Sequence, residues 1–379
     1  MKMTNDKNKL IELGKLFFHM GWIAFGGPAA HIAMMEKEIV SKRKWIDSQH
    51  FLDLMGATNL IPGPNSTEMV MHCGYERAGW KGMVVAGFSF IFPAVFLTTC
   101  LAWLYELYGT LPEATPFIYG IKPAVIAIIL SALIKLGKKA LKTTELWVLG
   151  GLTVVACLLG LHEILAMFLS GIIGGLLYYF RQNKGSLKSI SPIFLLLQPL
   201  VGGQHEVTLK VFLQFLKISS LLYGGGYVLF AFLDAELVAS GWLTRQQLMD
   251  AVAVGQFTPG PVLSTAAFVG WQVGGGLWGA IAASIGIFLP SFILVALLNP
   301  LMSRIRKIAI ISAILDAINA AAVAIIAVVM IHMVEEVLVD WRTITIAALS
   351  IIVTQFYKQV NSMYVVLGGS ALGYLLMLL

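Results

Sequence analysis

Charged residues are scarce in this chain. They make up 12% of its 379 residues, whereas an ordinary soluble domain carries about 25%. Hydrophobic residues make up 58%, and several apolar runs approach the ~20 residues that a membrane-spanning helix needs. No period-two alternation is typical of a membrane barrel. The composition therefore predicts an all-α polytopic membrane protein.

Signatures of catalysis and of metal binding are also missing. The three cysteines lie far apart and form no CxxC or zinc-ligand spacing. His162-Glu163 is followed by Ala166, so it is not an HExxH motif, and no GxSxG nucleophile elbow occurs. A GxGxxG match over 274–279 has no βαβ pattern around it. We therefore expect no enzyme, no cofactor and no metal site.

What the chain does contain is an internal repeat with a spacing of 197 residues. The matched pairs are Trp45 with Trp242, Asp53 with Asp250, Pro62-Gly63-Pro64 with Pro259-Gly260-Pro261, Gly82 with Gly279 and Pro93 with Pro290. Two homologous halves in an apolar chain are typical of transporters whose site lies between the repeats. We expect an N-terminal repeat over 1–180, a linker over 181–207 that could hold an extra short membrane segment, and a C-terminal repeat over 208–379.

The basic residues predict that the two repeats are inverted. In the first repeat, Lys42–Lys44 and Lys135–Lys142 follow apolar segments, and the middle loop over 106–116 has no Lys or Arg. In the second repeat, the counterparts of both basic clusters have no Lys or Arg, and the middle loop holds Arg304–Lys307. Basic loops stay cytoplasmic, so equivalent loops lie on opposite faces of the membrane. The same rule explains the net charge of +6, so no nucleic-acid partner is expected. The alternative to inversion is that the basic residues cluster by chance.

Glycine and proline interrupt two segments in each repeat, at matched positions. The four breaks are Gly26-Gly27-Pro28, Pro62-Gly63-Pro64, Gly224-Gly225-Gly226 and Pro259-Gly260-Pro261. Such breaks are tolerated in a membrane where they line a buried or watery cavity. The segments over 16–35 and 51–75 are either full crossings or re-entrant hairpins, and flanking basic residues favour re-entry from the cytoplasmic side. Inverted repeats need an odd number of membrane crossings between equivalent points, so re-entry of both segments requires an extra crossing near 190–205.

Small polar residues follow the Pro-Gly-Pro breaks. They are Asn65, Ser66 and Thr67 in the first repeat, and Ser264 and Thr265 in the second. Half-helices that begin there would point N–H groups and positive dipole ends into a cavity, which suits an anion. The alternative is a set of proline kinks that serve packing alone.

Three ionisable residues lie close to the breaks or inside an apolar helix. Lys122 would bind an anion or reach back to the surface. Glu68, which aligns with Thr265, could carry a coupling proton, hold an arginine or be a plain first-turn acid. His31 could bind an anion, titrate near neutral pH or be a hydrogen-bonded structural residue.

Matched acidic pairs lie between the two breaks of each repeat. They are Glu36 with Glu38, and Asp234 with Glu236. Salt bridges to Arg43, Arg77 or Arg245 would let them gate each side, and Arg77 is also a candidate for positive charge at the site. The alternative is that the acids are solvated helix ends.

Taken together, these motifs resemble the chromate ion transporter family in its long, two-domain form. The resemblance rests on Phe25–His31, the following acidic pair, Trp45, both Pro-Gly-Pro triplets and Tyr223–Gly226. It implies secondary export of chromate, a tetrahedral divalent oxyanion, across the prokaryotic plasma (inner) membrane, with chromate resistance as the outcome. Candidate partners are chromate or sulfate, the lipid bilayer, a coupling proton and a second copy of the chain as a homodimer. A transporter of sulfate or another oxyanion and a passive anion channel are the alternatives.

Overall fold

The computed structural model describes residues 2–25, 27–58, 61–109, 111, 113, 115–182, 204–298, 309–357 and 360–378. This part of the chain is helical and contains no strand. Five of its helices are long and apolar enough to cross a bilayer: α4 (Asn65–Tyr108), α5 (Thr115–Ala140), α7 (Glu163–Gln182), α12 (Leu277–Leu298) and α14 (Ala309–Val337). The prediction of an all-α polytopic membrane protein is confirmed. Three features predicted from the sequence lie wholly or partly outside the described residues: Gly26, the crossing near 190–205 and Arg304–Lys307. Only the last two residues of that crossing, 204–205, are described, and they begin a helix.

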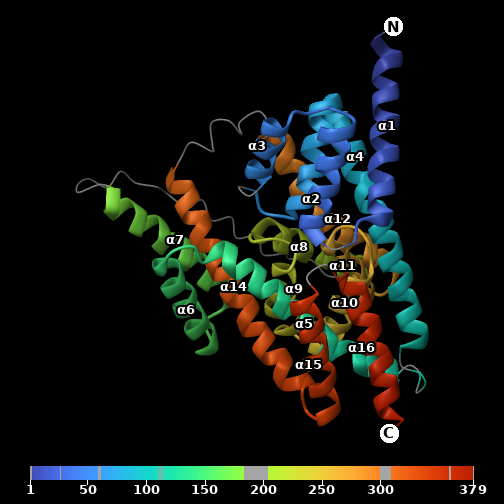
Figure 1. Cartoon of the computed structure of the whole chain (residues 1–379), viewed down its shortest axis with the longest axis vertical. Coiled ribbons are helices and arrows are strands. Elements are labelled where there is room, and N and C mark those ends of the chain that lie inside the picture. Colours follow the sequence, from blue (N-terminus) through green and yellow to red (C-terminus); the bar gives the residue numbers. More distant parts are fainter. Residues whose placement is uncertain are drawn as a thin grey trace.

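The first repeat begins with two helical hairpins whose turns are the predicted breaks. Helix α1 (Lys2–Ile23) runs inward and α2 (Gly27–Met35) returns, and α3 (Ser48–Thr58) precedes the start of α4 (Figure 1). Helix α4 is itself interrupted at Ala78 and Gly79, where the glycine has φ +63°, so its first part turns back and its second part crosses the molecule. Both segments are helical hairpins that turn at the predicted breaks, and their re-entry from the cytoplasmic side stays a prediction. Helices α5, α6 (Thr144–Leu158) and α7 complete the repeat.

The second repeat has the same elements in the same order. Its helices are α8 (Gln204–Leu221), α9 (Val228–Leu233), α10 (Arg245–Phe257), α11 (Thr265–Gly274), α12, α14, α15 (Trp341–Phe356) and α16 (Ser362–Met377). Gly275 and Gly276, both at positive φ, separate α11 from α12 just as Ala78 and Gly79 divide α4. Short π-helices, Glu36–Lys42 and Asp234–Val238, also occupy matching places.

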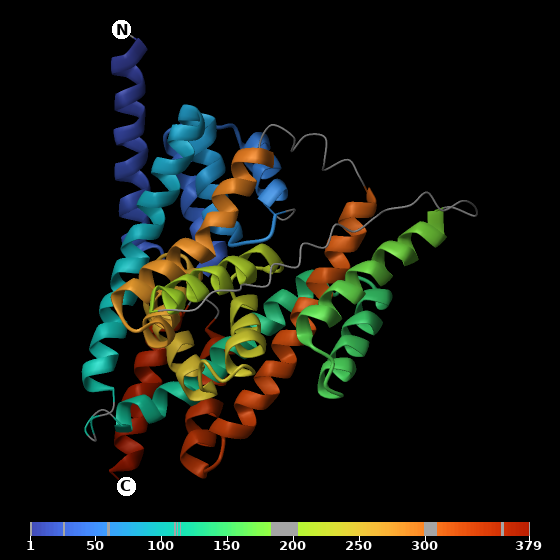
Figure 2. The ribbon, with the colours of Figure 1, turned by 180° about the vertical axis from the view of Figure 1, so that it is seen from behind.

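The repeats are inverted and interlocked. The long part of α4 runs down the view and α12 runs up it, while α5 rises and α14 descends (Figure 1, Figure 2). Helix α5 packs against α15 and α16 of the second repeat, and α14 packs against α6 and α7 of the first. Helix α5 of the first repeat and helix α14 of the second are therefore each packed against helices of the other repeat. The breaks of both repeats lie at this shared interface.

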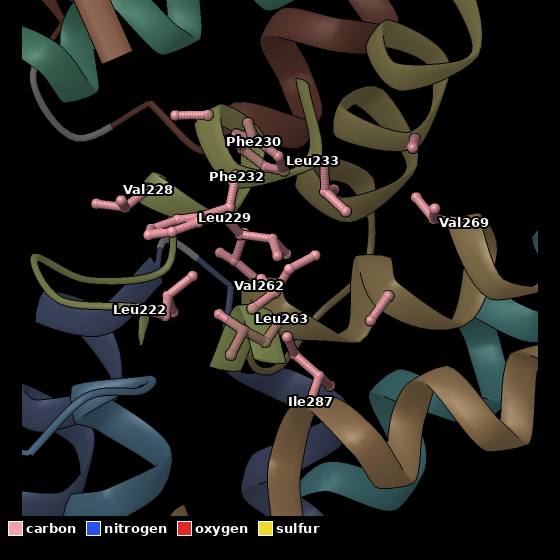
Figure 3. Close-up of a cluster of buried hydrophobic side chains, with 14 of the residues drawn as sticks. Leu222, Val228, Leu229, Phe230, Phe232, Leu233, Val262, Leu263, Val269 and Ile287 are labelled. Carbon is pink, nitrogen blue, oxygen red and sulfur yellow. The ribbon is translucent and has the colours of Figure 1, made fainter. Parts of the chain in front are cut away.

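Apolar side chains fix the second-repeat breaks in place. Leu222 precedes the glycine break, Val228 and Leu229 begin α9, and Val262 and Leu263 follow the second Pro-Gly-Pro (Figure 3). All are buried in one cluster. Because side chains inside proteins pack to crystal-like density, the backbone between them is held in a defined shape.

Candidate functional site between the repeats

A cavity of about 830 Å³ lies between the two repeats. Both repeats contribute break residues to its wall, together with asparagines from α4 and α14: Pro28, Asn65, Gly224, Gly225, Gly226 and Asn319. Four lysines of the first repeat also line it: Lys135, Lys138, Lys139 and Lys142. These lysines are exposed, so they mark the side on which the cavity meets solvent. Basic side chains therefore surround the opening of the cavity, and the interrupted helix segments form its inner wall, or floor.

The glycines of the second-repeat break form that floor. Gly224 and Gly225 have φ of +96° and +101°, a region that disfavours side chains. A Cβ on Gly224 would lie 3.3 Å from the Cβ of Ala322. Glycine therefore keeps the backbone accessible to a ligand at this point.

A second, smaller cavity of about 180 Å³ lies on the opposite side of the interface. It is lined in part by Lys122, Glu336 and Val339, which are the repeat counterparts of Asn319, Lys139 and Lys142 in the large cavity. The two cavities are thus equivalent parts of the inverted repeats, one wide and one narrow. The structure is open on the lysine side and constricted on the other.

Ion pairs hold the constricted side together. Arg245 on α10 lies 3.0 Å from Asp234 through Nε and 2.7 Å from Glu336 through Nη1. The second contact joins α10 to the end of α14, next to the small cavity. The predicted pairing of Asp234 with Arg245 is therefore present on this side.

Hydrogen bonds between the repeats close the same side. Tyr105 of α4 donates to Asp250 of α10 at 2.7 Å, and the indole of Trp271 donates to Glu106 at 2.6 Å. Tyr119 also donates to Asp340, the N-cap of α15. Lys122 lies half-buried at the small cavity, within electrostatic range of Asp250.

The Pro-Gly-Pro triplets form a reciprocal clamp between the repeats. The amide of Gly63 donates to the carbonyl of Leu222 at 2.7 Å, and the amide of Gly260 donates to the carbonyl of Ala24 at 2.9 Å. Each triplet thus binds the residue that precedes the break of the other repeat. All six residues of the two triplets, Pro62, Gly63, Pro64, Pro259, Gly260 and Pro261, are buried and none lines the large cavity. Their contact with an anion stays a prediction, whereas their contact with the other repeat is direct.

His31 belongs to the same clamp. Its Nε2 lies 2.9 Å from the carbonyl oxygen of Ala24, and its Nδ1 lies 3.1 Å from the hydroxyl of Ser66. A carbonyl can only accept, so Nε2 carries a proton, and in the neutral ring Nδ1 accepts from Ser66. The side chain is fully buried, which matches the structural alternative for this residue.

The other predicted small polar residues divide between cavity and interior. Asn65 lines the large cavity, whereas Ser66, Thr67, Ser264 and Thr265 are buried. The Ser264 hydroxyl accepts from Thr98 at 3.2 Å, and Thr265 donates to the carbonyl of Val262 at 2.7 Å. Contact of these four with an anion also stays a prediction.

The acids of the first repeat face its basic residues at the surface. Glu38 contacts Lys42 and lies 3.8 Å from Arg43, and the hydrogen bond from Lys42 lowers the pKa of Glu38. Arg77 contacts Glu12 of α1 at 3.2 Å instead of an acid of the pair. In the second repeat, Glu236 binds Lys217 at 2.7 Å. Glu36, whose pairing stays a prediction, has no ion pair among those the structure places.

Sequence patterns pointed to some cavity residues for a different reason. The four lysines of α5 and its C-terminal end give an orientation signal in the sequence, and Asn319 lies 197 residues after Lys122, at the repeat spacing. Ser131 on α5 also lines the cavity and carries no signal beyond one polar residue in an apolar helix. Within the described residues, no group of three or more His, Cys, Asp or Glu could hold a metal ion.

Inverted repeats, broken helices that meet at one interface and a cavity open on one side define a class, the polytopic membrane transporters. The chromate transporter family model matches residues 11–175 and 209–374, one match in each repeat. The chain belongs to the chromate transporter family. No solved structure matches it.

Named relatives cover nearly the whole chain. A chromate transport protein of Pseudomonas aeruginosa is 30% identical over 83% of this chain and 79% of its own length. A chromate transport protein of Cupriavidus metallidurans is 28% identical over 96% and 92%. YwrB, an uncharacterised transporter of Bacillus subtilis, is 32% identical and matches 38% of this chain but 73% of itself, so the match is no longer than one repeat.

Proposed function

We propose that this protein is a secondary active transporter that exports chromate across the plasma membrane and thereby confers chromate resistance. The observation that carries the proposal is the pair of equivalent cavities between the inverted repeats, a wide one on the side of Lys135–Lys142 and a narrow one on the other side. Membership of a transporter family and the names of its relatives supply the substrate. By the positive-inside rule the lysine side is cytoplasmic, so the described conformation is ready to accept an anion from inside the cell.

The asymmetry of the two cavities favours a carrier over a channel. A channel needs a continuous path, whereas here a hydrogen bond between the repeats, from Tyr105 to Asp250, and the Arg245 ion pairs within the second repeat close one end. Inverted repeats provide an equivalent second state in which the wide and narrow cavities exchange. Transport would then alternate between the two states around the shared breaks.

Charge and geometry explain why a divalent oxyanion fits. The lysines raise the local concentration of anions at the mouth, and the amides of Asn65 and Asn319 can donate hydrogen bonds deeper in the cavity. Gly27, Pro28 and the glycines at 224–226 leave space for the anion near the meeting point of the two breaks. Sulfate has the same charge and tetrahedral shape, so a sulfate transporter is the alternative that this chemistry supports.

Flux into proteoliposomes tests the proposal. Purified protein is reconstituted, and uptake of labelled chromate and of labelled sulfate is measured under imposed pH and voltage gradients. Saturable chromate uptake that accumulates against its gradient is expected. Resolvable single-channel currents would instead identify a channel, and uptake of sulfate but not chromate would change the assigned substrate. A matched control replaces Lys81, an exposed lysine beside Trp80 and away from the cavity, with glutamine.

A further inference from the structure

One carboxyl group is enclosed where the two repeats meet. Glu68 lies in the first turn of α4 and is fully buried. Its Oε1 accepts a hydrogen bond from the Ser291 hydroxyl of α12 at 3.1 Å. Its Oε2 is buried with no hydrogen-bond partner among the described residues. No arginine or lysine among the described residues forms an ion pair with the Glu68 carboxyl group.

The neighbours of Glu68 connect it to the large cavity and to the second-repeat break. Asn65, one turn earlier on α4, lines the large cavity. Gly63 lies against the carboxyl group, because a Cβ added there would sit 2.3 Å from Oε1. The same glycine donates to Leu222, at the edge of the second-repeat break. A shift between the repeats would therefore change the surroundings of this carboxyl group directly.

The titratable groups around Glu68 leave it without a counter-charge. From the second-repeat break, the Tyr223 phenol lies within electrostatic range. On its own helix, His72 is one turn further along, and His31 of α2 is engaged by Ser66 and Ala24. A buried carboxylate with one bare oxygen is strongly disfavoured, whereas the neutral acid accepts at Oε1 and leaves a hydroxyl at Oε2.

We propose that Glu68 is a proton-binding site coupled to the transport cycle, with a proton on Oε2 in the conformation described here. The proton comes from the aqueous phase when water reaches the carboxyl group, and it returns to water when movement of the second-repeat break exposes Oε2. Thr265 occupies the equivalent position in the second repeat and bonds its own backbone. Each chain therefore carries one such site, which corresponds to one coupled proton.

This inference rests on the proposed transport function, and coupled flux tests it. In proteoliposomes, the wild-type protein should accumulate chromate when a pH gradient is imposed, with a matching proton movement reported by a trapped pH dye. Glu68→Gln keeps the size and an acceptor for Ser291 but cannot release a proton. It should retain chromate–chromate exchange and lose both pH-driven accumulation and the proton signal. Wild-type coupling in Glu68→Gln would overturn the assignment.

Glu76→Gln is the matched control, because Glu76 lies on the same helix but is partly exposed and pairs with His50 at 3.2 Å. It should leave coupling intact; if it uncouples as Glu68→Gln does, the effect is not specific to Glu68 and the assignment fails.

Infrared spectroscopy supplies a readout that does not depend on transport. Purified wild-type protein near neutral pH should show the C=O band of a protonated carboxylic acid that Glu68→Gln lacks. Absence of that band in the wild type would overturn the proton site even if chromate is transported. If the band is present but no oxyanion moves, the proposed transport function fails and its coupling to Glu68 fails with it, while the proton on Glu68 stands. Should Glu68→Gln not fold, a band that changes in the wild type on adding chromate supports the site, and a band that does not change contradicts it.

Discussion

Removing Arg245 should open the constricted side. Arg245 bridges Asp234 and Glu336 there, at 3.0 Å and 2.7 Å. Partly exposed ion pairs each contribute about 0.5–1 kcal/mol, so Arg245→Gln should weaken the closure by about 1–2 kcal/mol. That corresponds to about a 5–30-fold shift toward the outward-open state, since ~1.4 kcal/mol is tenfold in an equilibrium constant.

Thiol labelling from outside the cell measures this shift. A cysteine that replaces Val337, a buried residue in the small cavity, is introduced in a background without the three native cysteines. The initial rate of reaction with a membrane-impermeant reagent should rise about 5–30-fold when Arg245→Gln is added.

The matched control is Arg181→Gln, which removes an exposed pair with Glu145 at 2.9 Å, remote from the constriction. It should leave the labelling rate of the Val337 cysteine unchanged. Equal rates in the Arg245→Gln, Arg181→Gln and parent proteins would refute the idea that these ion pairs hold the outer side closed.

Three further predictions follow from the cavity and the clamp. Lys139→Gln should raise the KM for chromate several-fold with little change in kcat, whereas Lys81→Gln should not, as initial rates over a range of chromate concentrations would show. Gly260→Leu should abolish flux while the protein still inserts, because that glycine has φ +90° and a Cβ would meet α4 at 2.8 Å; Gly151→Leu, in open space on α6, should keep wild-type flux. Glu36 and Lys139 are the first-repeat counterparts of Asp234 and Glu336. A pair of cysteines that replaces Glu36 and Lys139 should therefore cross-link when the inner side closes, and transport should stop until the disulfide is reduced. Unimpaired transport after complete cross-linking would contradict this.

The inverted fold could be predicted because its causes are local. Glycine and proline break helices wherever they occur, and basic loops set orientation without reference to tertiary structure. The breaks at Pro62–Pro64 and Pro259–Pro261 therefore fall where expected, and the first repeat begins with two helical hairpins that turn at its breaks.

The role of the Pro-Gly-Pro triplets could not be predicted from spacing. A broken segment can face a cavity or a partner segment, and the choice depends on packing between distant parts of the chain. Here the carbonyls of Leu222 and Ala24 occupy the positions next to Gly63 and Gly260. The partnership of His31 with Ser66, 35 residues away, has the same origin.

The lysines of the cavity show a different limit of sequence reasoning. The sequence predicts that Lys135–Lys142 set the orientation in the membrane, and the structure adds that these four lysines line the large cavity. Their place at the mouth of the cavity depends on how α5 crosses α14 and α16, and that crossing is set by the exchange of helices between the repeats.

Chromate protection of a cysteine at Ser131 tests directly whether the anion passes between the two repeats. This residue lines the large cavity, and its replacement by cysteine is nearly isosteric. In inverted membrane vesicles, a thiol reagent applied from the cytoplasmic side should label it, and chromate should slow that labelling. Chromate should not change the labelling rate of a cysteine at Ser284, which is equally buried on α12 but away from the cavity. Labelling of the Ser131 cysteine that chromate does not slow would contradict an anion path between the two repeats.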